Sequence, residues 1–143
     1  MRELITEAHA RGMNVILDYV AHHVHQEHPL YKAHPEWTTP LYLPDGTMNT
    51  EKWDEHRLTT WFDTFLPTWK FADHNVVDAL TDTAMHWVES YDLDGFRHDA
   101  TKHVEIDFWQ TLTQKIEHYR ADHPERKIYQ IGETYGNPEL ISS

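Results

Sequence analysis

The pair of residues most suggestive of catalysis is Arg97 and Asp99, which lie two positions apart in the stretch 95–103. Apolar residues before them predict a short strand, and residues i and i+2 of a strand point to the same side. The guanidinium is therefore expected beside the carboxylate, where it favours the ionised form of Asp99. Such an Asp can serve as a nucleophile or an electrostatic stabiliser, or the pair can simply fix a loop.

A second carboxylate, Glu133, follows the next predicted strand, 128–131. Parallel strands of an α/β sheet or barrel end at the same edge, so Asp99 and Glu133 are expected together at the carboxyl edge, where such folds hold their active sites. An ionised Asp facing a Glu that can stay protonated is the arrangement of a glycoside hydrolase. One group attacks the anomeric carbon and the other protonates the leaving oxygen.

Three motifs resemble the signature regions of the α-amylase family, glycoside hydrolase family 13. Residues 95–103 resemble its second region, Gly132 and Glu133 resemble its third, and residues 18–23 resemble its first. They occur in the family's order, each at the end of a predicted strand. The resemblance covers nearly the whole chain and implies an α/β fold, a (β/α)8 TIM barrel.

The length indicates only part of that barrel, because a complete one needs about 250 residues and this chain has 143. We predict a partial barrel, residues 1–143, that spans about strands 3 to 5 of the family's barrel. Within it, residues 24–73 are expected to form an enlarged loop or small subdomain after the first strand present. Prolines punctuate this segment, no helical period is sustained, and long loops in compact domains are usually functional.

The resemblance implies a retaining mechanism on α-glucans such as starch or maltooligosaccharides. Asp99 would attack the anomeric carbon, Glu133 would protonate the glycosidic oxygen and later activate water, and Arg97 would keep Asp99 charged. Asp18 is expected to orient a loop rather than to react. The family's third catalytic acid belongs to a later region that is not in this sequence, so the isolated chain is expected to be inactive or nearly so.

The resemblance also implies that His23, Lys102 and His103 bind substrate, the last two on the leaving-group side of the cleft. His22 stands where many family members have an Asn that helps to bind calcium. Calcium prefers oxygen ligands, so we predict no calcium at that position and no other cofactor. A transition-metal site among the histidines of residues 22–28 is the alternative, but the segment lacks the H-E-x-x-H spacing of a zinc site.

The remaining elements are expected where periodicity and turn residues place them: helices over 2–11, 75–91 and 105–121, and strands over 13–19 and 93–97. The crossover helices should cover the sheet through apolar faces, with Trp87 on the face of the helix over 75–91. Aromatic residues are frequent in 24–73. We expect most of them to form a small core and one or two to touch glucan.

The amino-acid composition limits the kinds of partner that the chain is expected to bind. The formal net charge is -12, which disfavours nucleic acid because phosphate binding relies on clustered Lys and Arg. A neutral glucan tolerates this charge. No apolar run is long enough to span a bilayer, so no membrane partner is predicted. The absence of Cys excludes disulfides, and the compartment stays open.

Other functions remain open at this point. The chain can be a non-catalytic glucan-binding module, or part of a glycosyltransferase of the same family, which uses the same catalytic residues. A partial barrel also leaves strand edges unpaired and lacks the opposite half of its interior. We therefore expect either self-association or dependence on the missing part of the barrel.

Overall fold

The computed structural model describes residues 1–136. The helices are α1 (Arg2–His9), α2 (Pro29–Ala33), α3 (His74–Tyr91) and α4 (Ile106–Asp122), and the 3-10 turns are η1 (Pro35–Trp37) and η2 (Thr101–His103). The strands are β1 (Ile16–Tyr19), β2 (Gly95–His98) and β3 (Tyr129–Gly132). The predicted alternation of helices and strands is confirmed, although β1 begins at Ile16 rather than at residue 13. Within the described residues, no helix combines the length and apolar character needed to cross a bilayer.

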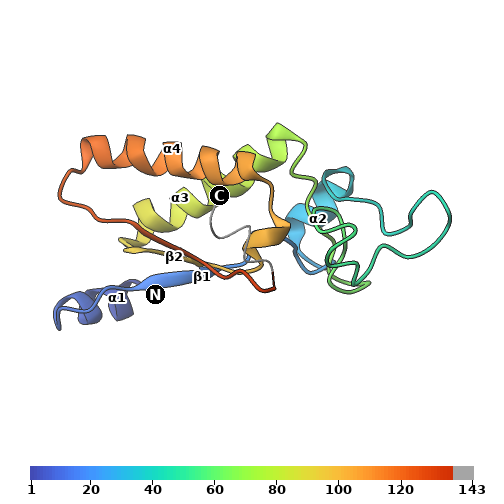
Figure 1. The fold of residues 1–143 in the computed structure, drawn as a ribbon. Coiled ribbons are helices and arrows are strands. Elements are labelled where there is room, and N and C mark those ends of the chain that lie inside the picture. The colour runs from blue at the N-terminus through green and yellow to red at the C-terminus, as the bar shows by residue number, and fades with distance from the viewer. Residues whose placement is uncertain (137–143) are drawn as a thin grey trace.

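The strands form one parallel sheet in the order β1-β2-β3. In its register, Asp18 of β1 lies opposite Arg97 of β2, which lies opposite Ile131 of β3. Helices α3 and α4 run along one side of this sheet, and the long segment after β1 extends beyond the carboxyl ends of the strands (Figure 1). The strand ends and this segment therefore share one edge of the molecule.

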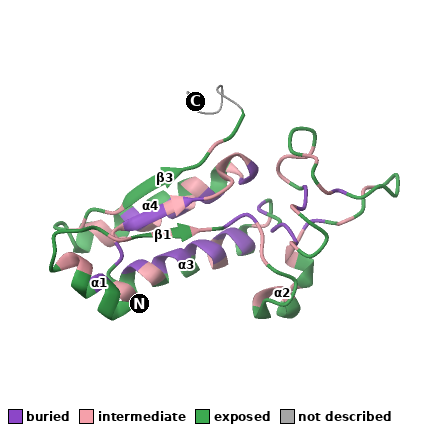
Figure 2. Cartoon of the chain, turned by 90° about the horizontal axis from the view of Figure 1, so that it is seen from below, coloured by how far each residue is buried: buried purple, intermediate pink, exposed green. Residues whose placement is uncertain are grey.

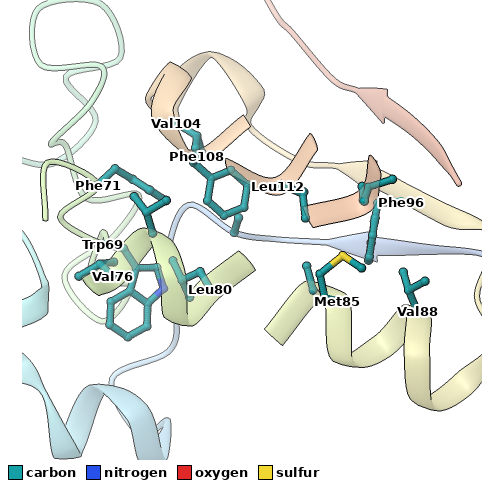
Figure 3. Packing of buried hydrophobic residues seen from close by; sticks show 14 residues of the cluster. Trp69, Phe71, Val76, Leu80, Met85, Val88, Phe96, Val104, Phe108 and Leu112 are labelled. Atoms are coloured by element: carbon teal, nitrogen blue, oxygen red, sulfur yellow. The ribbon is translucent and has the colours of Figure 1, made fainter. Parts of the chain in front are cut away.

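The core lies between the sheet and the two long helices. Asp73 caps α3, because its carboxylate accepts a hydrogen bond from the backbone N–H of Asn75 at 3.0 Å. The fully or nearly fully buried core side chains of α3, β2 and α4 are Val76, Val77, Leu80, Ala84, Val88, Phe96, Phe108, Leu112 and Ile116 (Figure 3). Trp87 is only partly buried, but it packs against this cluster as predicted, and Met85 of the same helix lies within the cluster.

No helix of residues 1–136 lies over the other face of the sheet (Figure 1). Its apolar side chains are open to solvent: Ile16 is 39% exposed, Tyr129 is 43% exposed and Ile131 is 55% exposed. All of β3 is exposed in Figure 2. In a closed barrel this face would point inward and be packed by layers of side chains from the other strands.

The long segment between β1 and α3 contains the short α2 and η1 and a few isolated bridges. Three of its aromatic rings are buried, those of Trp61, Trp69 and Phe71. Trp69 and Phe71 belong to the same hydrophobic cluster as the helices. The segment is therefore anchored to the main core through these two rings, and Trp53 and Phe65 remain exposed.

Gly95 fixes how closely β2 and β3 approach. Its φ is +149°, and a Cβ atom added there would lie 2.1 Å from the carbonyl oxygen of Tyr129. No side chain fits that gap without moving the β3 backbone. The pairing of β2 with β3, which carries Glu133 to its place, thus depends on a glycine at this position.

We expect Gly95→Ala to lower the free energy of unfolding by about 3 kcal/mol or more, because it adds a steric clash to an unfavourable φ. Gly12→Ala is the matched control, since Gly12 also has a positive φ, +73°, but open space around it, and should cost about 1–2 kcal/mol. Urea unfolding followed by circular dichroism measures both. Equal losses would contradict the close approach of β3 at Gly95.

Candidate active site at the carboxyl edge of the sheet

Two carboxylates predicted from the sequence leave the sheet side by side. The backbone N–H of Asp99 donates to the carbonyl oxygen of Tyr19 at 3.4 Å, and that of Glu133 donates to the carbonyl oxygen of His98 at 2.9 Å. Each carboxylate thus begins the loop directly after a strand while its backbone is still tied to the neighbouring strand. The expectation that parallel strands bring them to one edge is confirmed.

Arg97 joins the carboxylates of all three strands. Its Nη1 lies 2.8 Å from an oxygen of Asp99 and 2.9 Å from an oxygen of Asp18, and its Nη2 lies 2.7 Å from an oxygen of Glu133. The bond to Asp18 is the largest of the causes that raise the pKa of Arg97. The contact with Asp99 was expected; those with Asp18 and Glu133 follow from the sheet register.

A small pocket opens beside this ion-paired group. Its volume is about 200 Å³, and its lining residues are Phe62, Asp99, Ala100, Lys102, His103, Glu133 and Tyr135. A second hollow of about 510 Å³ shares Phe62, Lys102, His103 and Tyr135 with it and extends toward Trp53. The structure therefore brings both carboxylates together with Lys102 and His103 around one space.

A larger hollow of about 810 Å³ lies between α3 and α4. Its central cation, Lys115, lies 2.7 Å from an oxygen of Asp82 and 3.3 Å from one of Asp78. Neither strand-end carboxylate lines it. Parallel α/β folds hold their chemistry at the carboxyl edge of the sheet, so the smaller pocket beside Asp99 is the better candidate despite its size.

Three histidines pack around Phe62, which lines the pocket together with one of them, His103. The rings of His22, His23 and His103 lie 4.6, 4.7 and 5.2 Å from that of Phe62, measured between centroids. Burial lowers the pKa of His22 well below its ordinary value, and the neighbouring His23 and His103 lower it further. Burial also lowers the pKa of His23, although nearby Asp99 opposes this. His23 is not among the residues that line the pocket.

His103 and Lys102 lie in the turn η2, which follows Asp99. The side chain of Lys102 is 9% exposed, and its Nζ lies 3.4 Å from an oxygen of Asp54. His103 is 5% exposed and its Nδ1 lies 2.7 Å from the carbonyl oxygen of Arg57. The sequence did not suggest Asp54 or Arg57, because they are distant along the chain and belong to a segment with no regular pattern.

The surroundings of His22 do not fit calcium. Its side chain is fully buried, its Nδ1 lies 3.2 Å from Nδ1 of His23, and its Nε2 has no hydrogen-bond partner. The ring offers nitrogen, whereas calcium takes six to eight oxygen ligands. Among residues 1–136, no group of three or more His, Asp or Glu side chains has the geometry of a metal site. The absence of calcium stays a prediction.

The family described as "Alpha amylase, catalytic domain" has a model that matches residues 1–137. The "Intracellular maltogenic amylase" of Bacillus subtilis (strain 168) is 26% identical over 96% of this chain and 23% of its own length. "Alpha-amylase 3" of Dictyoglomus thermophilum is 25% identical over 97% of this chain and 30% of its own length. The chain thus spans less than a third of these relatives.

Solved structures show the same relation in space. An alpha-amylase from Geobacillus thermoleovorans, solved in complex with acarbose, is 29% identical and superposes with a TM-score of 0.77 over 98% of this chain and 30% of its own. An Anoxybacillus alpha-amylase is 26% identical, with a TM-score of 0.76 over 98% and 29%. The three-stranded parallel sheet and its helices are therefore part of a (β/α)8 barrel.

The buried histidines make stability depend on pH. The pKa of His22 is lower in the folded chain than in the unfolded chain, so the unfolded state binds a proton first as the pH falls below about 6.5. The stabilising contribution of the neutral ring is complete above that pH and is lost below it. We expect the free energy of unfolding to fall less steeply between about pH 7 and about pH 5 in His22→Asn than in the parent.

Urea unfolding followed by tryptophan fluorescence at several pH values measures this slope. His118→Asn is the matched control, because His118 is exposed on α4 and its replacement changes no buried group. It should keep the parental slope. A parental slope in His22→Asn would contradict the assignment of the pH dependence to this ring.

Proposed function

The chain belongs to the alpha-amylase catalytic-domain family, and on that premise we propose that it forms part of a retaining glycoside hydrolase that cleaves α-1,4 bonds in starch and maltooligosaccharides. The curated relatives are named as maltogenic amylases, alpha-amylases and a cyclomaltodextrinase. Activity, substrate and partners refer to the longer protein, since the first curated relative is matched over only 23% of its length.

One observation carries the proposal: Arg97 lies within 2.8 Å of both Asp99 and Glu133, at neighbouring strand ends that border one pocket. The guanidinium beside Asp99 favours the ionised form of that carboxylate, as a nucleophile needs, and Glu133 stands close by at the neighbouring strand end. Retaining glycosidases need such a pair, with carboxyl groups about 5–5.5 Å apart.

The proposed reaction gives each of these three residues one role. Asp99 attacks the anomeric carbon while the bond to the leaving oxygen breaks, and Glu133 gives that oxygen its proton. Water then attacks the glycosyl intermediate, its proton passes to Glu133, and Asp99 leaves as a carboxylate. Two displacements return the anomeric carbon to its original configuration. Arg97 stabilises the negative charge of Asp99 before it attacks and after it leaves.

We assign substrate contacts to three further residues. Lys102 and His103 border the pocket and the hollow beyond it, so they are suited to hold the sugar on the leaving-group side. His23 packs against Phe62 and feels the charge of Asp99, so it is suited to hydrogen-bond the sugar that reacts. All three offer nitrogen groups that pair with hydroxyls.

The isolated chain should not be catalytic. The third catalytic acid that the family resemblance implies is not in the sequence, and charge stabilisation in the transition state is usually the largest single contribution to catalysis. The uncovered face of the sheet also leaves the pocket open on one side.

Release of reducing sugar from soluble starch and from a maltooligosaccharide tests the proposal. We expect activity from the longest polypeptide that contains this chain, none or almost none from the 143-residue chain, and a loss of at least about a thousandfold in Asp99→Asn. Arg11→Met is the control, because Arg11 pairs only with Glu7 on the far end of α1 among its described ion pairs. If the longer polypeptide is inactive but retained on starch, a glucan-binding function replaces this one.

We also propose that the isolated 143-residue chain self-associates. The uncovered sheet face presents Ile16, Tyr129 and Ile131, and β1 and β3 are edge strands, which readily pair with other chains. In the longer polypeptide the rest of the barrel takes this place. Light scattering should give a mass above the 17.0 kDa of one copy. A monodisperse monomer with a cooperative thermal transition would count against self-association.

A further inference from the structure

The turn η2, which carries Lys102 and His103, is held from the side of β3. It begins after Ala100, whose φ of 51° and ψ of 37° place a non-glycine residue in the left-handed region. Such a conformation persists only where the surroundings hold it. The backbone N–H and the hydroxyl of Thr101 both donate to the carbonyl oxygen of Glu133, at 3.1 and 2.7 Å.

A single residue of the long segment, Arg57, holds the same turn from the other side. Its Nη1 donates to the carbonyl oxygen of Lys102 at 2.5 Å, and its own carbonyl oxygen accepts from Nδ1 of His103 at 2.7 Å. The two bonds run in opposite directions and join positions 45 and 46 residues apart. Together they fix the position and the orientation of the turn relative to the long segment between β1 and α3.

The second bond also determines which ring nitrogen of His103 carries hydrogen. A carbonyl oxygen only accepts, so Nδ1 must be the donor. Burial lowers the pKa of His103, which keeps the ring neutral at neutral pH. Nε2 is then left with a lone pair, and the ring becomes an acceptor for a sugar hydroxyl rather than a second cation beside Lys102.

Asp54 contributes less to this arrangement. It lies in the same segment and its carboxylate pairs with Nζ of Lys102, but at 3.4 Å and with 77% of its side chain exposed. The Lys102 side chain is only 9% exposed, but the carboxylate end of the pair is in solvent and the separation is long, so screening weakens the contact. The backbone-directed bonds of Arg57 are therefore the stronger restraint on the turn.

We propose that Arg57 is a positioning residue for the leaving-group side of the cleft, acting through its bonds to Lys102 and His103. The inference rests on the proposed function, since it takes that pair to hold the leaving sugar. Arg57 itself lines neither the pocket beside the carboxylates nor the hollow beyond it. Its side chain acts by fixing where Lys102 and His103 stand, while its backbone carbonyl, which any residue at this position would offer, determines which nitrogen of the imidazole is free.

A comparison of two substrates distinguishes this positioning role from a general effect of the substitution on catalysis. Maltotetraose places sugar on the leaving-group side, whereas α-maltosyl fluoride has only fluoride there. In the longest polypeptide that contains this chain, Arg57→Met should reduce kcat/KM for maltotetraose about tenfold or more, and for α-maltosyl fluoride less than about threefold. Arg57→Lys, which retains one donor, should recover part of the loss, and the distant control Arg11→Met should lose nothing.

A second readout does not depend on activity. Nitrogen-15 and proton spectra of histidine-labelled protein report the Nδ1–H of His103, whose acceptor, the backbone carbonyl of residue 57, is kept in every variant. Loss of the guanidinium bond to Lys102 lets the turn shift, so this signal should move in Arg57→Met and stay near its parental position in Arg57→Lys. Equal losses on the two substrates, or an unchanged His103 signal, would overturn the positioning role. A parent inactive on both substrates refutes the proposed function, and the spectra then decide the role of Arg57 alone; Arg57→Lys serves if Arg57→Met does not fold.

Discussion

The arrangement of charge around Arg97 is the interaction on which the rest of the site depends. Asp18 lies in β1, Asp99 directly follows β2 and Glu133 directly follows β3, and Arg97 contacts each of them. Carboxylates held this close would repel one another without a cation between them. The parallel register puts Asp18 and Arg97 at the same level, and the bond from the backbone of Glu133 to that of His98 brings the third carboxylate to it. The pairing of the three strands and the neutralisation of these carboxylates by Arg97 therefore depend on each other.

The long segment after β1 supplies the other side of the site and combines a small buried interior around Trp61 with an attachment to the main core. Trp69 and Phe71 attach it to the cluster formed by α3, α4 and the sheet, and Phe62 packs among the three histidines. Because these rings exclude water, the histidines are neutral and act as hydrogen-bonding groups rather than as cations. In a chain whose formal charge is -12, Arg97 pairs with the strand-end carboxylates and Lys102 borders the same pocket as a second cation.

In the described part of the chain, helices cover only one face of the sheet. Helices α3 and α4 bury the outer face of the sheet (Figure 1), while the inner face leaves Ile131 and Tyr129 in solvent. Part of a barrel has this asymmetry because its inner face packs only against the other strands. The pocket beside Asp99 lies at the end of this sheet and is bordered by residues of the described part of the barrel alone.

The sequence by itself determined the order of helices and strands, the family resemblance, and the meeting of Asp99 with Glu133 at one edge. These follow from local apolar patterns and from the rule that parallel strands end together. Only the tertiary structure decided that Arg97 also holds Asp18 and Glu133, that His103 is buried, and that Arg57 bonds to the turn after Asp99. These contacts join positions from 36 to 79 residues apart in the chain or depend on strand register, as the bond from Arg97 to Asp18 does across 79 residues. No local pattern encodes them, because the segment that carries Arg57 has no period from which its path can be derived.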